Sequence, residues 1–237
     1  MKEKHELYLN TYMKKIMLKE LNAVIYLLDI SELNPDECDV HKYIPEDRYK
    51  KMRAFSLKED RARLLGNELI FEYGLNELYG IQVYNKCSES WIKRDTLEKG
   101  KPYLSCFPEV CYNMSHSGKY SICSFSKRTI GTDIELIQEN KLQVAKSYYN
   151  AEEYNKLVSL DEIDQRYKFY EIWVLYESFL KAIGQGLSIP FNRYSFEKNG
   201  DIFKVIHDYD NNSYISQVIN LNDGDYIFAV CVKLSQE

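Results

Sequence analysis

This 237-residue chain has no excess of basic residues, no long apolar run and no export signal. It carries 31 Lys and Arg against 36 Asp and Glu, whereas domains that bind nucleic acid usually show a basic stripe. No apolar run approaches the roughly 20 residues that span a bilayer. Its first residues lack the apolar region of a signal peptide. We therefore expect a cytoplasmic protein that binds neither nucleic acid nor membrane.

The chain is also poor in zinc-binding patterns. It has six cysteines without a C-x-x-C pair and only four histidines, which argues against a zinc site. Without an export signal, the cysteines are expected to be reduced thiols packed in the interior. The hydrophobic content of 45% suffices for one large core or for two smaller fused ones.

Hydrophobic patterning predicts both helices and strands. Residues 1–22 are predicted to form a helical or mobile lead. The other predicted elements are a strand at 24–30, a helix at 58–79, strands near 102–106, 110–114, 119–125 and 129–135, helices from about 150 and over 164–183, and strands within 193–234. This order allows two similarly built halves, residues 23–126 and 127–237.

Two acidic residues stand in the apolar strand predicted at 129–135. Asp133 and Glu135 occupy positions i and i+2, which point to the same face of a strand. Like charges on one strand face repel each other, and a bound cation would remove that repulsion. Oxygen ligands with few histidines suit Mg²⁺. The alternative is an edge strand whose two acids face solvent.

The helix predicted at 164–183 carries an apolar stripe, and Glu177 and Lys181 lie at or beyond the edge of that stripe. Both side chains could border a cleft while the helix stays anchored in the core. The alternative is an exposed i, i+4 ion pair worth about 0.2–0.5 kcal/mol.

Several further residues are candidates for binding an anion. Ser115-His116-Ser117-Gly118 offers hydroxyls, backbone amides and an imidazole, which suit a phosphate. The region from Lys42 to Arg63 is locally basic in an otherwise acidic chain, and its best candidates, with one from a later turn, are Arg48, Lys51, Arg63 and Lys101. Glu153 fits a helix capping box that starts at Asn150.

Together these residues resemble the 4′-phosphopantetheinyl transferases of the surfactin-synthetase-activating type, which serve peptide and polyketide synthases. The resemblance runs from about Val24 to Val232. Its anchors, in order, are Pro45-Glu-Asp-Arg48 with Lys51 and Phe55, Lys58-Glu-Asp60, Arg63-Leu-Leu-Gly66, Gly100-Lys-Pro102, Tyr112-Asn-Met-Ser-His-Ser117, Ile130-Gly-Thr-Asp-Ile-Glu135, and Trp173 to Lys181 with Gly184-x-Gly-Leu187.

The resemblance implies an α+β fold of two pseudo-symmetric halves with the active site between them. It implies transfer of the phosphopantetheine arm of coenzyme A to a serine of an apo-carrier protein, with release of 3′,5′-ADP. We expect the enzyme to act as a monomer. The implied site comprises Asp133, Glu135 and Glu177 as Mg²⁺ ligands, Lys181 as the phosphate and transition-state cation, Arg48, Lys51, Arg63 and His116 at the 3′-phosphate end of coenzyme A, and Lys101, Pro102 and Ser115 at the rest of the nucleotide.

The base that takes the serine proton stays open between Glu153, Glu177 and a metal-bound water. The chain also departs from the family, which usually has lysine where Tyr176 stands, and no role is assigned to the Tyr176 hydroxyl. That missing charge motivates an alternative, a binding module for coenzyme A or a carrier protein that transfers poorly. A Mg²⁺-dependent phosphodiesterase would fit the carboxylates but would leave Lys101, His116 and the basic segment unexplained.

Overall fold

The computed structural model describes residues 2–37, 39–85, 90–139, 141–186, 193–221 and 224–234. Its helices are α1 (Lys2–Tyr12), α2 (Glu46–Ala54), α3 (Lys58–Tyr79), α4 (Leu142–Tyr148), α5 (Ala151–Val158) and α6 (Glu162–Ile183), with a short 3₁₀ helix at Val40–Lys42. Its strands are β1 (Met13–Leu18), β2 (Ala23–Asp29), β3 (Tyr84–Asn85), β4 (Ser90–Trp91), β5 (Asp95–Thr96), β6 (Pro102–Tyr103), β7 (Cys111–Ser117), β8 (Tyr120–Ser126), β9 (Ile130–Leu136), β10 (Tyr194–Asn199), β11 (Ile202–His207), β12 (Tyr214–Asn220) and β13 (Tyr226–Lys233).

Two antiparallel sheets organise the chain. The first has the strand order β1-β2-β8-β7, and the second has the order β10-β11-β12-β13-β9. Two short hairpins, β3–β4 and β5–β6, lie between the strands of the first sheet in sequence. All strands of the first sheet precede all strands of the second. The α+β class with two sheet-based halves is therefore confirmed.

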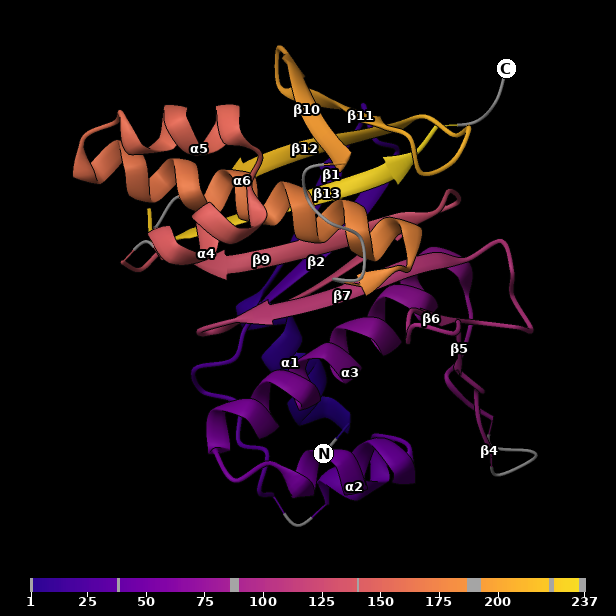
Figure 1. Cartoon of the computed structure of the whole chain (residues 1–237). Coiled ribbons are helices and arrows are strands. Elements are labelled where there is room, and N and C mark those ends of the chain that lie inside the picture. The colour runs from indigo at the N-terminus through magenta and orange to yellow at the C-terminus, as the bar shows by residue number, and fades with distance from the viewer. Residues whose placement is uncertain are drawn as a thin grey trace.

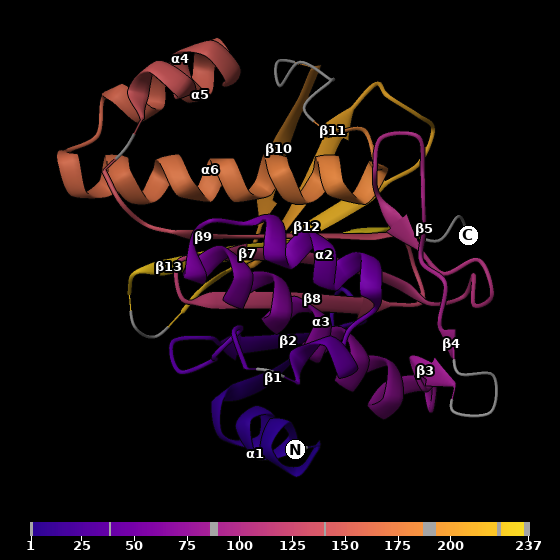
Figure 2. The ribbon, with the colours of Figure 1, turned by 90° about the horizontal axis from the view of Figure 1, so that it is seen from below.

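The sheets and helices form layers, with α3 on the outer face of the first sheet and α6 on the outer face of the second (Figures 1 and 2). Alternation along the strands builds this arrangement. On β2, Tyr26 and Leu28 belong to the core under α3, whereas Ile25 and Leu27 belong to a core shared with the second sheet. That shared core joins the two halves and fixes their relative position.

Both long helices form as the sequence predicts, and both end at a glycine. The helix predicted at 58–79 is confirmed as α3, and α6 begins two residues earlier than predicted because Asp161 caps it. Gly184 adopts φ 72° after α6, a left-handed conformation that glycine enters without steric cost. The capping box at Asn150 and Glu153 is also present.

The N-terminal lead needs a correction. Residues 1–22 were predicted to be helical or mobile, and Lys2–Tyr12 is a helix, but Met13–Leu18 forms β1, which pairs antiparallel with β2 along its whole length. The lysines of β1 hide its strand pattern, since charged side chains are common on edge strands. The prediction also missed α4. None of the helices within the described ranges is long and apolar enough to cross a membrane.

Candidate active site at the junction of the two sheets

Among the described strands, β9 pairs along one edge only, and its other edge has no strand partner. It pairs antiparallel with β13, and the amide of Lys233 donates to the carbonyl of Thr129. Because antiparallel neighbours alternate between bonded and non-bonded pairs, the backbone groups of the even-numbered residues from Ile130 to Leu136 point away from β13. They point toward β7 of the first sheet, which lies beside β9.

Side chains from the first half fill this free edge in place of a backbone ladder. Three described hydrogen bonds do so, from Lys101 Nζ to Ile130 O (3.0 Å), from Thr132 N to Asn113 Oδ1 (2.9 Å) and from Leu136 N to Ser117 Oγ (3.0 Å). The residues Asn113, Ser115 and Ser117 alternate along β7, so they share one strand face. The junction between the halves is therefore polar, and it holds the candidate site.

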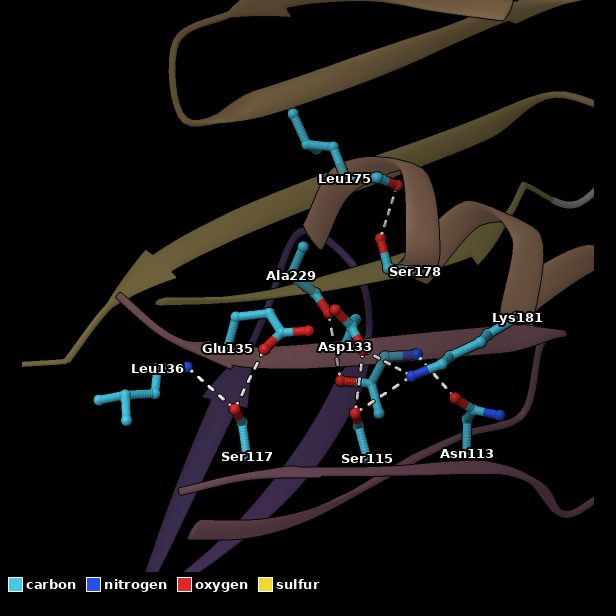
Figure 3. A network of polar contacts seen from close by, with 11 residues as sticks. Asn113, Ser115, Ser117, Asp133, Glu135, Leu136, Leu175, Ser178, Lys181 and Ala229 are labelled. Carbon is cyan, nitrogen blue, oxygen red and sulfur yellow. Dashed lines mark hydrogen bonds and ion pairs between the residues drawn. The ribbon is translucent and has the colours of Figure 1, made fainter. Parts of the chain in front are cut away.

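Lys181 reaches from α6 into this junction (Figure 3). Its Nζ lies 2.5 Å from Asp133 Oδ1 and 3.1 Å from Ser115 Oγ, and the Ser115 hydroxyl donates to the same Asp133 oxygen at 3.0 Å. Asp133 is 4% exposed and Ser115 is 8% exposed. Lys181 therefore pairs with a nearly buried carboxylate, and a solvated i, i+4 contact with Glu177 does not describe it.

Gly131 allows α6 to approach β9 closely enough for this contact. A Cβ atom at Gly131 would lie 2.1 Å from the carbonyl oxygen of Ser178 and 2.2 Å from the amide nitrogen of Ala182. Both atoms are helix backbone, which cannot move aside as a flexible side chain can. The glycine therefore sets the depth at which Lys181 leaves its helix.

Two of the three candidate carboxylates, Glu135 and Glu177, have raised pKa values. Burial raises the pKa of Glu135, the negative charge of Asp133 raises it further, and hydrogen bonds from Ser117 and Trp173 act in the opposite direction. Burial also raises the pKa of Glu177, and Asp133 again adds to the shift. The negative charge of Asp133 thus raises the pKa of both glutamates, so the three carboxylates lie close enough to interact electrostatically.

One oxygen atom in this environment is buried without a partner among the described residues. It is Asp133 Oδ2, and burial without a hydrogen bond is costly for a carboxylate oxygen. Within the described ranges, no three His, Cys, Asp or Glu side chains lie close enough to hold a metal by themselves. Mg²⁺ commonly takes only one or two carboxylates and completes its shell with water and substrate phosphates. The donor set at Asp133 and Glu135 fits that mode of binding.

Basic groups gather next to the carboxylates. Burial by its neighbours lowers the pKa of His116, and the positive charges of Arg63 and Lys181 lower it further. The His116 side chain keeps an exposed surface, so solvent moderates both effects. Arg63 donates to the carbonyl of Gly118 (3.0 Å) and pairs with Asp60. Mutual repulsion of these cations is relieved by a bound anion.

A cavity of about 340 Å³ adjoins this group. The first half lines it with Arg63, Ser117 and Gly118, and the second half lines it with residues that include Glu135 and Trp173. Its volume falls in the range of small-molecule sites, about 300–1,000 Å³. The site therefore opens into a space that can hold a ligand and that both halves enclose.

The remaining predicted ligand-binding residues lie further apart. Arg48 pairs with the buried Glu68 at 2.8 Å, and Lys51 is exposed on α2. Lys101 and Pro102 line a second cavity of about 420 Å³. The Lys101 ammonium donates to two backbone carbonyls, those of Ile130 and Ala182. Lys101 therefore offers its stem, and not its charge, to that cavity.

Glu153 has partners of its own. Its carboxylate accepts a hydrogen bond from the Tyr176 hydroxyl at 2.6 Å and a longer one from the Asn150 amide at 3.3 Å. Tyr176 is fully buried. Its hydroxyl, to which the sequence assigns no role, has the Glu153 carboxylate as a hydrogen-bond partner. The described contacts of Glu153 thus join α5 to α6, whereas Glu177 shares the field of Asp133 and Lys181.

The sequence placed Asn113, Ser117 and Trp173 within motifs, but their individual supporting roles become visible only in the structure. Asn113 and Ser117 hold the free edge of β9, and Ser117 also donates to Glu135 Oε2 at 3.1 Å. Their period-two spacing with Ser115 was the available signal. Trp173, an anchor of the resemblance, also lines the 340 Å³ cavity.

Comparisons with known proteins identify the family to which the chain belongs. A family model described as the 4′-phosphopantetheinyl transferase superfamily matches residues 129–231. The chain is 32% identical to 4′-phosphopantetheinyl transferase Sfp of Bacillus subtilis (strain 168) over 191 residues, which make up 80% of this chain and 82% of that protein. It is 33% identical to 4′-phosphopantetheinyl transferase gsp of Aneurinibacillus migulanus, over 70% of this chain and 69% of that protein. The chain therefore belongs to the 4′-phosphopantetheinyl transferase superfamily.

Proposed function

We propose that the junction of the two sheets is where this transferase moves the phosphopantetheine arm of coenzyme A to a serine of an apo-carrier protein. In this reaction the serine oxygen bonds to the β-phosphorus of coenzyme A. The bond from that phosphorus to the bridging oxygen breaks, and 3′,5′-ADP leaves. The observation that carries the proposal is the contact of Lys181 with Asp133 and Ser115, which places a cation and a carboxylate between the two halves.

Lys181 is the residue we assign to the transferring phosphate. A fixed ammonium in a partly dry site stabilises the negative charge that develops on phosphoryl oxygens, without reorganisation during the reaction. Its side chain is 29% exposed, so a phosphate can reach it. Ser115 holds both Lys181 and Asp133, and we assign it to orienting the pair next to the substrate.

Asp133 and Glu135, with Glu177 nearby, would hold Mg²⁺. When bound there, the ion would neutralise charge on the pyrophosphate. The unpartnered Oδ2 of Asp133 and the raised pKa of Glu135 support this assignment, because a cation would relieve both.

Glu177 is our choice for the base that takes the serine proton. Burial raises its pKa toward the range in which a carboxylate accepts a proton more readily. Glu153 is less suited, since the Tyr176 hydroxyl and the Asn150 amide already use its carboxylate. The proton passes from the serine hydroxyl to Glu177 as the new bond to phosphorus forms.

Arg63 and His116 would bind the 3′-phosphate of coenzyme A, and Arg48 and Lys51 are further candidates for the same group. The support is the crowding of positive charge around His116. The cavity lined by Lys101 and Pro102 would take another part of the nucleotide. Its lining includes both apolar and polar side chains, as small-molecule sites usually do.

The test is incubation of the protein with coenzyme A, Mg²⁺ and a panel of apo-carrier proteins, followed by intact-mass measurement. We expect a carrier to gain the mass of one phosphopantetheine arm while an equal amount of 3′,5′-ADP appears. Consumption of coenzyme A without carrier modification would identify a hydrolase. Binding of coenzyme A without either change would identify a binding module.

Mg²⁺ is tested separately by binding. Mn²⁺, observed by its electron paramagnetic resonance signal, should bind the wild type and should bind Asp133→Asn and Glu135→Gln at least tenfold more weakly. Equal binding by all three proteins would place the ion elsewhere.

A further inference from the structure

Lys101 is the one lysine of the predicted nucleotide site whose ammonium lies inside the protein. It belongs to the turn between β5 and β6, in the first half of the chain. Its Nζ donates to the carbonyl of Ile130 at 3.0 Å and to the carbonyl of Ala182. Both acceptors belong to the second half, so the side chain bridges the two halves.

The carbonyl of Ala182 needs an external partner. The last carbonyls of a helix have no amide one turn further along the helix to accept from. In α6, the carbonyl of Leu180 accepts hydrogen bonds from the amides of Gly184 and Gln185. The carbonyl of Ala182 accepts one from the Lys101 ammonium. A cation at this end also interacts favourably with the helix dipole. Lys101 therefore caps the final turn of α6.

The carbonyl of Ile130 also needs a hydrogen-bond donor from outside its own sheet, for a different reason. It lies on the free edge of β9, where the backbone groups point away from β13. Lys101 thus ties the end of α6 to the start of β9 with one side chain. Gly131, the residue after Ile130, lies against the α6 backbone at Ser178 and Ala182.

The catalytic candidates lie next to both points. Lys181 directly precedes Ala182, and Asp133 follows Ile130 by three residues on the same strand. The stem of Lys101 also packs against the end of the helix, since a Cβ at Gly184 would lie 3.2 Å from Lys101 Cδ. A shift of the last turn of α6 would move Lys181 relative to Asp133.

We propose that Lys101 is a positioning residue, whose ammonium holds the last turn of α6 on β9 so that Lys181 stays against Asp133, and that its charge does not bind coenzyme A. This inference rests on the proposed function for its assay, since Lys181 must act in transfer for its position to matter. Burial lowers the pKa of Lys101 to about 8, as expected for an ammonium enclosed by protein.

The experiment separates turnover from binding in Lys101→Met. We expect kcat to fall by about ten- to a hundredfold, the effect of a small displacement of a catalytic group. The Kd of coenzyme A, measured by calorimetry, should stay within about threefold of the wild type. A direct contact between the ammonium and the nucleotide predicts the opposite, a Kd at least tenfold higher with kcat nearly unchanged at saturation, and that result would overturn the proposal.

A double mutant tests whether Lys101 acts through Lys181. In the Lys181→Met background, Lys101→Met should lower kcat by less than about twofold, because the group that it positions is gone. Losses that multiply would mean a general structural role and would also overturn the proposal. If Lys101→Met does not fold, Lys101→Gln, which keeps two donors, serves in both measurements.

Lys93→Met is the matched control. Lys93 lies in the same segment, and its side chain is 76% exposed with an ion pair to Asp95. Its kcat and Kd should equal those of the wild type. Wild-type transfer in the same assay checks the proposed function independently, so a failure of one proposal is distinguishable from a failure of the other.

Discussion

The Lys181 ammonium lies 2.5 Å from Asp133 Oδ1, and this contact joins the last turns of α6 to the middle of β9. Ser115 of the first sheet bonds to both residues. The site therefore exists only when the two halves are together, and its polar groups are those that hold the halves in register. Changes at this junction should affect stability and transfer through separable physical causes.

Lys181→Met should lower kcat by about a hundredfold or more if the ammonium stabilises charge in the transition state. It should also lower the free energy of unfolding by about 2 kcal/mol, because Asp133 loses a charged hydrogen-bond partner in a nearly buried position. Lys168→Met is the control, since Lys168 on the same helix pairs with Glu171 at the surface. Turnover assays and urea unfolding of both variants measure these effects, and near-normal turnover of Lys181→Met would return that lysine to a structural role.

Gly131→Ala should be strongly destabilising, by about 3 kcal/mol or more, because its Cβ would meet the backbone of α6 at 2.1 Å. The helix must then move away from β9, so any folded protein should also lose turnover. Gly200→Ala is the control. Gly200 has φ 60° with no atom within 4 Å of an added Cβ, so only the backbone strain of about 1 kcal/mol applies. Chemical denaturation should show the larger loss for Gly131→Ala, and equal losses would contradict the proposed close packing.

Glu177→Gln should stabilise the protein at about pH 8 more than at about pH 4, with chelator present. Burial raises the pKa of Glu177 above its usual 4.5, so the folded state binds this proton more tightly than the unfolded state. The stability from that proton is complete below the unfolded value and is lost as the pH rises through the folded value. Glutamine has no such loss. Thermal unfolding should therefore show a larger Tm gain of Glu177→Gln over the wild type at the higher pH. An equal Tm difference between the two proteins at both pH values would contradict the raised pKa.

Tyr176→Phe should cost about 1–3 kcal/mol of unfolding free energy and leave kcat within a few-fold of the wild type. The variant removes the donor at 2.6 Å from Glu153, whose carboxylate is partly buried, while the ring keeps its packing. Tyr12→Phe, at a tyrosine that is 38% exposed, is the control. A loss of turnover without a loss of stability would mean that the phenol itself takes part in the reaction.

The missing lysine at position 176 has a structural explanation. Tyr176 is enclosed by aromatic rings, which include those of Tyr149, Tyr194 and Phe196. Its hydroxyl uses the carboxylate of Glu153 as a partner in place of a charge pair. The sequence shows the loss of a positive charge at this position, but it cannot place Glu153 beside Tyr176.

Local patterns were enough to predict α3, α6 and the capping box at Asn150, since helix periodicity and capping depend on residues a few positions apart. They also predicted that Asp133 and Glu135 share a strand face, which β9 bears out, because its regular pairing with β13 from Ile130 to Leu136 keeps the two-residue alternation. A resemblance of ordered motifs predicted the family. These results needed no knowledge of which segments meet.

The partners of the site residues depended on the packing of the whole chain. Lys181 meets Asp133 across 48 positions, and Lys101 meets Ala182 across 81. Lysine looks the same in sequence whether its ammonium faces a substrate, a carboxylate or a helix end. The choice follows from the shared core that presses the two sheets together, the depth set by Gly131, and the backbone groups that β9 leaves unpaired, and these arise only when the halves pack.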